Sequence, residues 1–564
     1  SHDLKALLHI LETFPRDELM QSTTDELFET AMDVVHLQER QRVKLFIRRD
    51  GFGRFFSCLV YLPRDRYNSQ VRSRIENLLY RALNGKSVEH NVTLSESALA
   101  RLHIIVRTAP WKLPKYDRAA LEQDIALAVR SWQDELRDAL VEHCGEERGL
   151  SLFGRYANHF PAAYQEDIPA RPAAFDIEQI DTLTGETSLR MSLYRPTSAP
   201  SGYLRFKTFH REQPIPISDA LPMLENMGVR VISERPYELE LRDDSIIWVQ
   251  DFELVHQGEL DVEALKDLFQ EQFVRVWRGE AENDGFNRLV LSAGLNWRQT
   301  TLLRAYCKYL LQTSLNFSQA YMERAIYANP QIAKLIVKLF EARLDPSAAR
   351  DRDVLTQRYI TEIDKALESV SSLDEDRILR GFINVVRATL RTNYFQTTEH
   401  NEPKTYLSFK FDPSQLPDLP LPKPVYEIWV YSPRVEGVHL RGGKVARGGI
   451  RWSDRREDFR TEVLGLMKAQ QVKNTVIVPV GSKGGFYVKR PPRSGNREDL
   501  LKEGIACYQT FMRGLLDITD NIVDGKIAPP LKVMRHDGDD PYLVVAAVKG
   551  TATFSDIANG VSRE

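Results

Sequence analysis

The spacing of the apolar residues changes repeatedly along this chain, and this change limits the possible fold more than any other feature. Near residues 42–110 and 173–275, short runs of β-branched and aromatic residues alternate with single helix-like segments. From about 285 to 395 the apolar residues recur at helical spacing alone. With 564 residues the chain is also too long for one core. We therefore expect several domains of mixed class.

The first stretch is expected to form a small α+β module. Three runs have strand composition, and one run between them has helical spacing followed by Gly85, a residue typical of a helix end. The expected elements are the strands Phe55–Tyr61, Val92–Leu94 and Leu102–Val106 and the helix Asn68–Asn84. This alternation predicts a ferredoxin-like sandwich. One long amphipathic helix is expected next, because Leu121, Ile125, Trp132 and Leu136 fall on one stripe.

The second stretch repeats this architecture without a clear repeat of sequence. Its helix carries Leu221 and Leu224, and we expect it to begin at Ser218 and to end at Gly228. Val229 to Val231 and Ile246–Val249 are predicted strands.

The stretch between 285 and 395 predicts packed helices. Two apolar stripes at helical spacing support this interpretation, namely Leu302, Leu303, Tyr306, Leu310 and Leu311, and Ile332, Leu335, Ile336, Leu339 and Phe340. The proline-rich stretch 416–424 that follows is expected to be a linker or a rigid crossover. The expected division is a helical lead-in (1–41), a first module (42–112), a helical linker (113–172), a second module (173–275), a helical domain (276–400) and a final α/β domain (401–564).

Charge and cysteine content exclude several classes of partner and site. The net charge of -3 gives no electrostatic reason to expect binding to nucleic acid or to an anionic membrane. The four cysteines lie far apart without a C-x-x-C pair, which favours a reducing, cytoplasmic location and argues against a metal site. The longest apolar runs, such as Val544–Ala547, are much too short to cross a membrane. The chain lacks an initiator methionine and stops directly after a helix-like segment, so we interpret both ends as cut.

Residues 440–486 contain cations beside paired glycines. Arg447 precedes Gly448 and Gly449, and Lys483 precedes Gly484 in a predicted glycine turn. A helix over Thr461–Val472 is expected between them, with Lys473 at its end, followed by a strand at Thr475–Pro479. Glycines allow a ligand to approach the backbone, and cations there can pair with carboxylates. Spacing alone predicts no more than an anion-binding cleft, because such a turn is more often an ordinary exposed loop.

The motifs GGIRW, LMKAQQVKN and PVGSKGGF in this segment resemble those of glutamate dehydrogenases, in detail the very large bacterial-type NAD-specific class. The resemblance covers nearly the whole chain, through RFFSCLVYLPRDRYNSQVR (54–72), ENDGFNRLVLSAGLNWRQTTLLRAYCKYL (282–310) and RHDGDDPYLVVAAVKGTATFSDIAN (535–559). It implies that the two α+β modules are ACT-like and that residues 401–564 are the substrate-binding half of a catalytic domain.

The resemblance also implies roles for individual residues. Lys473 is expected to hold the α-carboxylate of the substrate, and Lys483 to activate the water that attacks iminoglutarate. Arg447 stands where shorter relatives have a lysine for the side-chain carboxylate, and Lys444 is the alternative for that role. Gly448, Gly449 and Gly484 are the expected glycines of the substrate site.

One position departs from the family pattern. Where the resemblance leads us to expect the catalytic aspartate, in the form AADKGT, the sequence has Val548. A valine cannot exchange protons, and the loss of general acid–base catalysis costs roughly 100- to 10,000-fold in rate.

The sequence contains no G-x-G-x-x-G turn of a dinucleotide-binding fold, since its single G-x-G is Gly51–Gly53. We therefore expect a fragment of an NAD-dependent glutamate dehydrogenase that has no turnover by itself and binds L-glutamate or 2-oxoglutarate but no NAD. The alternative is a regulatory or oligomerisation module, in which the ACT-like units bind an amino-acid effector or assemble a homo-oligomer. A phosphate-binding NTPase is disfavoured, because the residue after Lys483 is not Ser or Thr.

Overall fold

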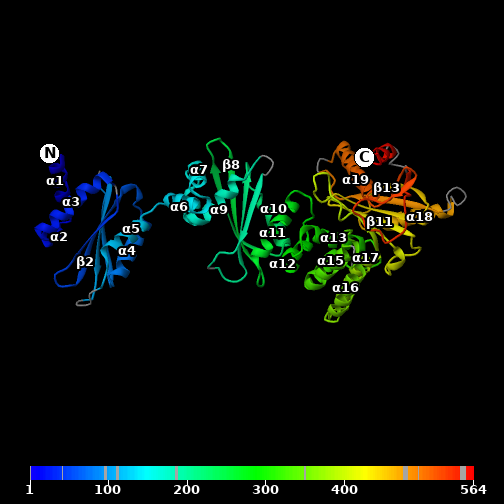
Figure 1. The fold of residues 1–564 in the computed structure, drawn as a ribbon, viewed down its shortest axis with the longest axis horizontal. Helices are drawn as coiled ribbons and strands as arrows, with labels where there is room; N and C mark the ends of the chain where they lie inside the picture. The colour runs from blue at the N-terminus through cyan, green and yellow to red at the C-terminus, as the bar shows by residue number, and fades with distance from the viewer. Residues whose placement is uncertain are drawn as a thin grey trace. The chain divides into compact units, whose positions relative to one another are not determined.

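The computed structural model describes residues 2–40, 42–94, 98–109, 114–184, 188–197, 199–348, 351–473, 480–492, 495–546 and 554–563 (Figure 1). Its contacts divide the chain into two compact units. The first is Ser1–Thr182 with Glu238–Asp244, and the second is Leu183–Tyr237 with Ser245–Glu564.

The first unit contains an antiparallel sheet in the order β1-β2-β4-β3, preceded by three helices. The elements are α1 (His2–Thr13), α2 (Arg16–Gln21), α3 (Thr24–Arg40), β1 (Lys44–Arg49), β2 (Phe55–Pro63), α4 (Ser69–Ala82), β3 (Ser87–Leu94) and β4 (Leu99–Arg107). The predicted strands and helix are confirmed. Asn68 begins α4 by accepting a hydrogen bond from the backbone of Val71, and Asn84 ends it with a φ of 51°.

The single long helix predicted after this sheet is wrong, because the chain forms two helices there. α5 (Arg118–Ala128) ends before Arg130, and α6 (Trp132–Cys144) starts after Ser131. Ser131 and Asp134 form a capping box, which favours a new helix start at this point even though the apolar stripe continues. The helices α7 (Glu146–Tyr156), α8 (Ala162–Asp167) and α9 (Ala170–Asp181) complete the unit.

The second module has the same topology as the first. Its elements are β5 (Leu189–Tyr194), β6 (Tyr203–Arg211), α10 (Ile217–Asn226), β7 (Arg230–Glu240), β8 (Ile246–Val255) and α11 (Val262–Trp277), with the sheet order β5-β6-β8-β7. Both modules run strand–strand–helix–strand–strand–helix, which is the ferredoxin-like β-α-β-β-α-β order shifted by one strand. The predicted start of α10 at Ser218 is wrong. The helix begins after Pro216, a residue that suits a helix start because its backbone has no N–H to satisfy.

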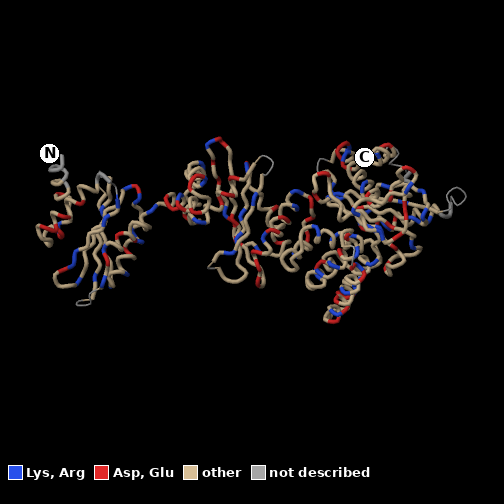
Figure 2. Tube along the Cα trace, in the orientation of Figure 1, with Lys and Arg blue, Asp and Glu red and all other residues tan. Residues whose placement is uncertain are grey.

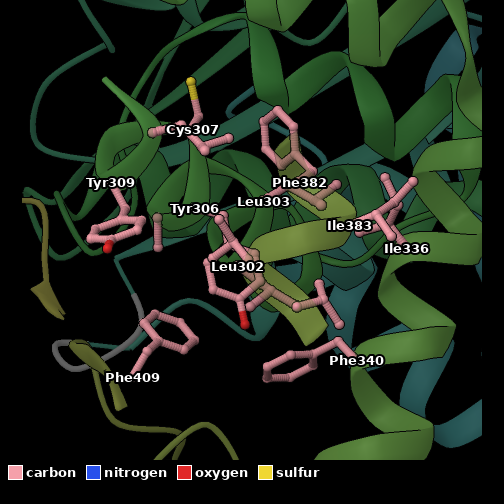
Figure 3. Close-up of a cluster of buried hydrophobic side chains, with 14 of the residues drawn as sticks. Leu302, Leu303, Tyr306, Cys307, Tyr309, Ile336, Phe340, Phe382, Ile383 and Phe409 are labelled. Atoms are coloured by element: carbon pink, nitrogen blue, oxygen red, sulfur yellow. The ribbon is translucent and has the colours of Figure 1, made fainter. Parts of the chain in front are cut away.

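The predicted helices between 285 and 395 are present, and they share one core with a sheet. The elements are α12 (Leu289–Ala293), α13 (Trp297–Leu310), α14 (Gln319–Ala328), α15 (Pro330–Leu344), α16 (Arg352–Leu367) and α17 (Leu373–Ala388). Figure 3 shows how side chains from α13, α15 and α17 gather around Tyr306, with Phe409 of the sheet beside them. The ring centroids of Tyr306 and Phe409 are 4.8 Å apart.

The final α/β part is a seven-stranded mixed sheet in the order β17-β13-β14-β12-β11-β10-β9. The elements are β9 (Thr389–Thr392), β10 (Leu407–Phe411), β11 (Tyr426–Tyr431), β12 (Val435–Arg441), β13 (Arg447–Ser453), α18 (Phe459–Lys473), β14 (Ser482–Val488), α19 (Arg497–Leu516), β17 (Val544–Ala546) and α20 (Phe554–Val561), with a small hairpin of β15 (Asn521–Val523) and β16 (Lys526–Ala528). α18 packs on one face with the helical region, and α19 and α20 pack on the other. β13, α18 and β14 form a parallel crossover unit.

The proline-rich stretch 416–424 connects the neighbouring strands β10 and β11. Leu416 and Leu419 are buried in the core shared with the helices. The stretch is therefore packed against the core of the second unit.

Basic and acidic residues are interspersed along the trace (Figure 2). Among the described residues no helix is long and apolar enough to cross a membrane.

Candidate functional site

The two glycine segments that carry the predicted site are strands, so the predicted glycine turn is wrong. Arg447, Gly448 and Gly449 begin β13, and Lys483 and Gly484 lie in β14. None of these glycines has a positive φ. The predicted helix over Thr461–Val472 is confirmed as α18. The predicted strand at Thr475–Pro479 lies outside the described residues.

The glycines are needed for close packing of backbone. A Cβ on Gly448 would overlap the carbonyl oxygen of Ser482 in the neighbouring strand. A Cβ on Gly485 would lie 2.5 Å from Cγ2 of Val463 in α18. Larger residues would therefore push apart β13, β14 and the helix that covers them.

The last turn of α18 lies beside the start of β13. The side-chain amide of Gln470 donates a hydrogen bond of 2.7 Å to the carbonyl oxygen of Arg447. Arg447 also forms an isolated parallel bridge with Gly481, just before β14. The helix end that carries Lys473 thus lies beside the first residues of β13 and β14, at the edge of the sheet where both strands begin.

Lys483 lies on the face of the sheet that α18 covers. Side chains alternate between faces along a strand, and Gly485, two residues later, faces Val463 of α18. Gly449 belongs to the same face, because Arg451, two residues later in β13, pairs with Glu462 of α18 at 2.7 Å. Next to Lys483 the sheet therefore presents a glycine on one side and Leu440 of β12 on the other.

The ammonium group of Lys483 is partly withdrawn from water. The residue is half-buried, and burial lowers the pKa of its side chain. Within the described parts of the chain it has no ion-pair partner. Oε1 of Gln470, also near this edge, is buried and accepts no hydrogen bond from the described residues. The edge thus offers a cation without an ion-pair partner and an acceptor without a donor among the described residues.

The other predicted site residues differ in exposure, and some of them lie outside the described residues. Arg447 and Lys444 are exposed, whereas Gly448, Gly449 and Gly484 are buried. Lys473 is the last residue of α18, and its side chain is outside the described set. Val548 lies outside the described residues, but β17, which ends at Ala546, pairs in parallel with Arg447, Gly448 and Gly449.

A buried ionic network, which the sequence analysis missed, holds the segment that leads into β17. Nη1 of Arg441 is 3.0 Å from Oδ1 of Asp540, and Nζ of Lys410 is 2.6 Å from Oδ2 of the same carboxylate. Arg391 pairs with Asp520 and Asp537 at 2.8 and 2.6 Å. Burial alone raises the pKa of Asp540, but Arg441 and Lys410 outweigh burial and hold this pKa at about 2.

The aspartates of the motif RHDGDDPY were the one sequence signal for this network. Their partners lie in distant strands, so that signal did not identify them. The network fixes the residues before β17 against the ends of β9, β10 and β12.

Gly51–Gly53 lies in the turn between β1 and β2 and leads into a strand, whereas a dinucleotide site requires a glycine turn that leads from a strand into a helix. His143, Cys144 and Glu178 in the first unit could bring ligand atoms within 4.8 Å of one another. This group belongs to α6 and α9 and is no part of the site in the mixed sheet.

Six family models match successive parts of the chain. The model for the bacterial NAD-glutamate dehydrogenase catalytic domain matches residues 362–564. The glutamate dehydrogenase ACT2 and ACT3 domains match 44–133 and 188–266. The glutamate dehydrogenase helical motifs 1, 2 and 3 match 1–40, 139–183 and 281–346.

Several curated relatives match over the full chain. The NAD-specific glutamate dehydrogenase of Halomonas elongata is 51% identical over 565 residues, and that of Pseudomonas aeruginosa is 48% identical over 569 residues. The NAD-specific glutamate dehydrogenase of Mycobacterium tuberculosis is 41% identical over 593 residues. The alignments include all of this chain but only 35%, 35% and 36% of these relatives. Successive parts of the chain thus match domains of bacterial NAD-specific glutamate dehydrogenases, and the chain spans about a third of the length of these relatives.

Proposed function

We propose that the edge of the mixed sheet formed by β13, β14 and the end of α18 is the substrate-binding half of a glutamate dehydrogenase site. The whole protein would oxidise L-glutamate with NAD and water to 2-oxoglutarate, ammonia and NADH. The observation that carries this proposal is the half-buried Lys483, without an ion-pair partner in the described chain, on the sheet face that α18 covers.

A five-carbon diacid suits this arrangement. Its two carboxylates require two cationic sites, and charge-assisted hydrogen bonds from lysine or arginine provide them. We assign the α-carboxylate to Lys473 at the end of α18, and the side-chain carboxylate to Arg447 or Lys444. The side-chain-free surface at Gly449 leaves room for the substrate carbon chain beside Lys483.

Lys483 is assigned the proton chemistry. Because burial lowers its pKa, a larger share of the side chain is neutral near neutral pH than for an exposed lysine. A neutral amine can accept the proton of the water that attacks the imine carbon. Val548 cannot supply the second acid–base group that this reaction requires.

The chain by itself is therefore proposed to bind substrate without turnover. NAD supplies hydride acceptance in the reaction, but this chain has no G-x-G-x-x-G turn to hold a dinucleotide.

Titration calorimetry with 2-oxoglutarate tests the binding proposal. The unaltered chain should bind weakly, and Lys483→Ala should lower the affinity about tenfold or more, since a hydrogen bond to a charged group contributes roughly 1.5–3 kcal/mol. Lys468→Ala, at an exposed lysine of α18, is the control and should bind normally. Equal affinity of the unaltered chain and Lys483→Ala would exclude this site. NADH formation from L-glutamate by the unaltered chain would contradict the proposed lack of turnover.

The two ACT-type modules carry a second proposal, the binding of an amino-acid effector or assembly into a homo-oligomer. Each four-stranded sheet ends in edge strands, β1 and β3 or β5 and β7, whose outer backbone groups can pair with another copy. Light scattering with size-exclusion chromatography measures the mass. A monomer at all concentrations would exclude assembly by these edges.

A further inference from the structure

A cavity of about 440 Å³ lies away from the glycine strands, at the other end of α18. It is bounded by the end of α13, the segment 311–319, the start of β12 and the residues just before α18. Its polar lining includes the charged or amide side chains of Lys308, Gln312, Gln319, Glu436, Arg456 and Glu457. The volume is within the usual range for small-molecule sites.

Lys308 is a buried cation that lines this cavity and forms no direct ion pair with the described residues. The residue is 7% exposed, and Nζ donates a hydrogen bond of 2.6 Å to Oε1 of Gln319. No carboxylate in the described parts of the chain lies within ion-pair distance of it. An ammonium has three donors, and a directly paired carboxylate would stabilise a buried charge of this kind.

Gln319 is held in this orientation from behind. Its Nε2 donates to Oε1 of Glu323 at 2.7 Å and to Oδ2 of Asp284 at 3.3 Å. Asp284 in turn is paired with the fully buried Arg304 at 2.8 Å. The amide oxygen is therefore fixed toward Lys308, so the cation has a defined position before any ligand binds.

A buried anion, Glu436, faces the same cavity from β12. The residue is 5% exposed, and its Oε1 lies 2.8 Å from Nζ of Lys489. Lys489 is shared, because it also lies 2.7 Å from Oε2 of Glu282 and donates to the carbonyl oxygen of Ser432. Lys489 thus only partly neutralises Glu436, whose carboxylate can accept further hydrogen bonds.

We propose that this cavity binds a small zwitterion of the α-amino-acid class, with its carboxylate on Lys308 and its ammonium on Glu436. The exposed pair Arg456 and Glu457 repeats the two charges at the rim. A simple anion would pair with Lys308 but would be repelled by Glu436. A simple cation would pair with Glu436 but would be repelled by Lys308. A zwitterion pairs with both buried groups and adds no net charge. This site shares no lining residue with the proposed diacid site.

The cavity is connected to the start of α18 by Gln312. Its Nε2 donates to the carbonyl oxygens of Arg456 and Glu457 at 3.0 and 3.1 Å, and its Oε1 accepts from the backbone N–H of Arg460 at 3.2 Å. A ligand that contacts Gln312 therefore contacts the side chain that holds the start of α18. The last turn of the same helix borders β13. Occupancy of the cavity is expected to change 2-oxoglutarate affinity.

Calorimetry on the Lys483→Ala variant tests the cavity while the affinity of the diacid site is lowered. The probes are glycine, L-alanine, L-serine, L-aspartate and L-lysine, each titrated alone, with acetate and methylammonium as ligands that carry one charge each. At least one amino acid should bind ten times more tightly than acetate or methylammonium.

Two further variants locate the bound amino acid. Lys308→Gln should weaken its binding tenfold or more. Because Lys308 is buried, Arg456→Ala provides a second measurement at an exposed position and should weaken binding two- to fivefold. Arg455→Ala is the matched control, since Arg455 pairs with Asp458 on the surface and does not line the cavity.

Three results would overturn the proposal. One is that none of the amino acids binds, and another is that acetate binds as tightly as they do, which would indicate an anion site. The third is binding that both Lys308→Gln and Arg456→Ala leave unchanged, which would place the ligand elsewhere in the chain.

Discussion

The side-chain amide of Gln470 donates a 2.7 Å hydrogen bond to the backbone carbonyl of Arg447, and so ties the last turn of α18 to the first residue of β13. These residues are 23 positions apart and belong to a helix and a strand of one crossover unit. The bond keeps the helix end that carries Lys473 next to the strand that carries the paired glycines. Substrate affinity should therefore depend on a residue that need not touch the substrate.

Gln470→Leu should lower the affinity for 2-oxoglutarate about three- to tenfold. The hydrogen bond contributes roughly 1 kcal/mol, and without it the end of α18 is less fixed relative to β13. Calorimetry measures the affinity, and Thr461→Ala, at the exposed start of the same helix, is the control. Unchanged affinity in Gln470→Leu would show that this tie does not position the site.

Lys483 should titrate below the usual lysine range. Burial disfavours its ammonium form, so the pKa in the folded protein is lower than in the unfolded chain. The charged side chain therefore opposes folding below the folded pKa, and this opposition is relieved as the pH rises through the folded and then the unfolded pKa. Reductive ¹³C-methylation and NMR titration measure this pKa, and Lys483→Arg identifies the signal.

Bound 2-oxoglutarate should raise the pKa of Lys483 again, because a nearby carboxylate stabilises the ammonium form. A Lys483 signal that titrates in the ordinary lysine range, with or without ligand, would contradict its assigned role in proton transfer.

Gly448→Ala should destabilise the mixed sheet by about 2–3 kcal/mol, because the new methyl group overlaps the carbonyl oxygen of Ser482 and overpacking has a cost of this order. Gly465→Ala is the matched control. Gly465 is exposed in α18 with nothing within 4 Å of an added Cβ, so alanine should stabilise that helix by up to about 1 kcal/mol. Urea unfolding compares the two. Equal effects would mean that β13 and β14 can separate without cost.

Asp540→Asn should destabilise the second unit by about 3–5 kcal/mol near neutral pH, because it leaves Arg441 and Lys410 buried with less opposite charge. The pKa of Asp540 is about 2, below its ordinary value of 3.8. Its ionised form therefore contributes its full stability above pH 3.8, and this contribution is lost as the pH falls toward 2.

The difference in unfolding free energy between the unaltered chain and Asp540→Asn should accordingly shrink between pH 5 and pH 2. Urea unfolding at a series of pH values measures it. A difference that stays constant over this range would show that the carboxylate is not the group responsible.

Local sequence predicted the elements whose signals are local. α4 was predicted from its apolar spacing and from Gly85 after its end, and α18 from helical spacing over Thr461–Val472. The break between α5 and α6 was missed because the apolar stripe continues across it, while the cap at Ser131 decides the helix start. The division into domains that the sequence suggested stays a prediction.

The glycine segments show where local interpretation failed. Glycine is common in turns, and a turn was predicted at Lys483, yet the chain is extended there. Only the neighbouring strand and α18 explain why glycine is required, because the restriction comes from Ser482 and Val463 rather than from the backbone angles of the glycines.

The sequence by itself determined the family resemblance, the strand and helix content and the identity of the cations beside the glycines. The tertiary structure alone decided which charges are buried together. Arg391 and Asp520 are 129 residues apart, and Lys308 and Glu436 meet at one cavity from a helix and a distant strand. Periodicity and capping act over a few residues, whereas a buried charge is stabilised by whichever partner the fold brings within a few ångströms, and no spacing in the sequence encodes that distance.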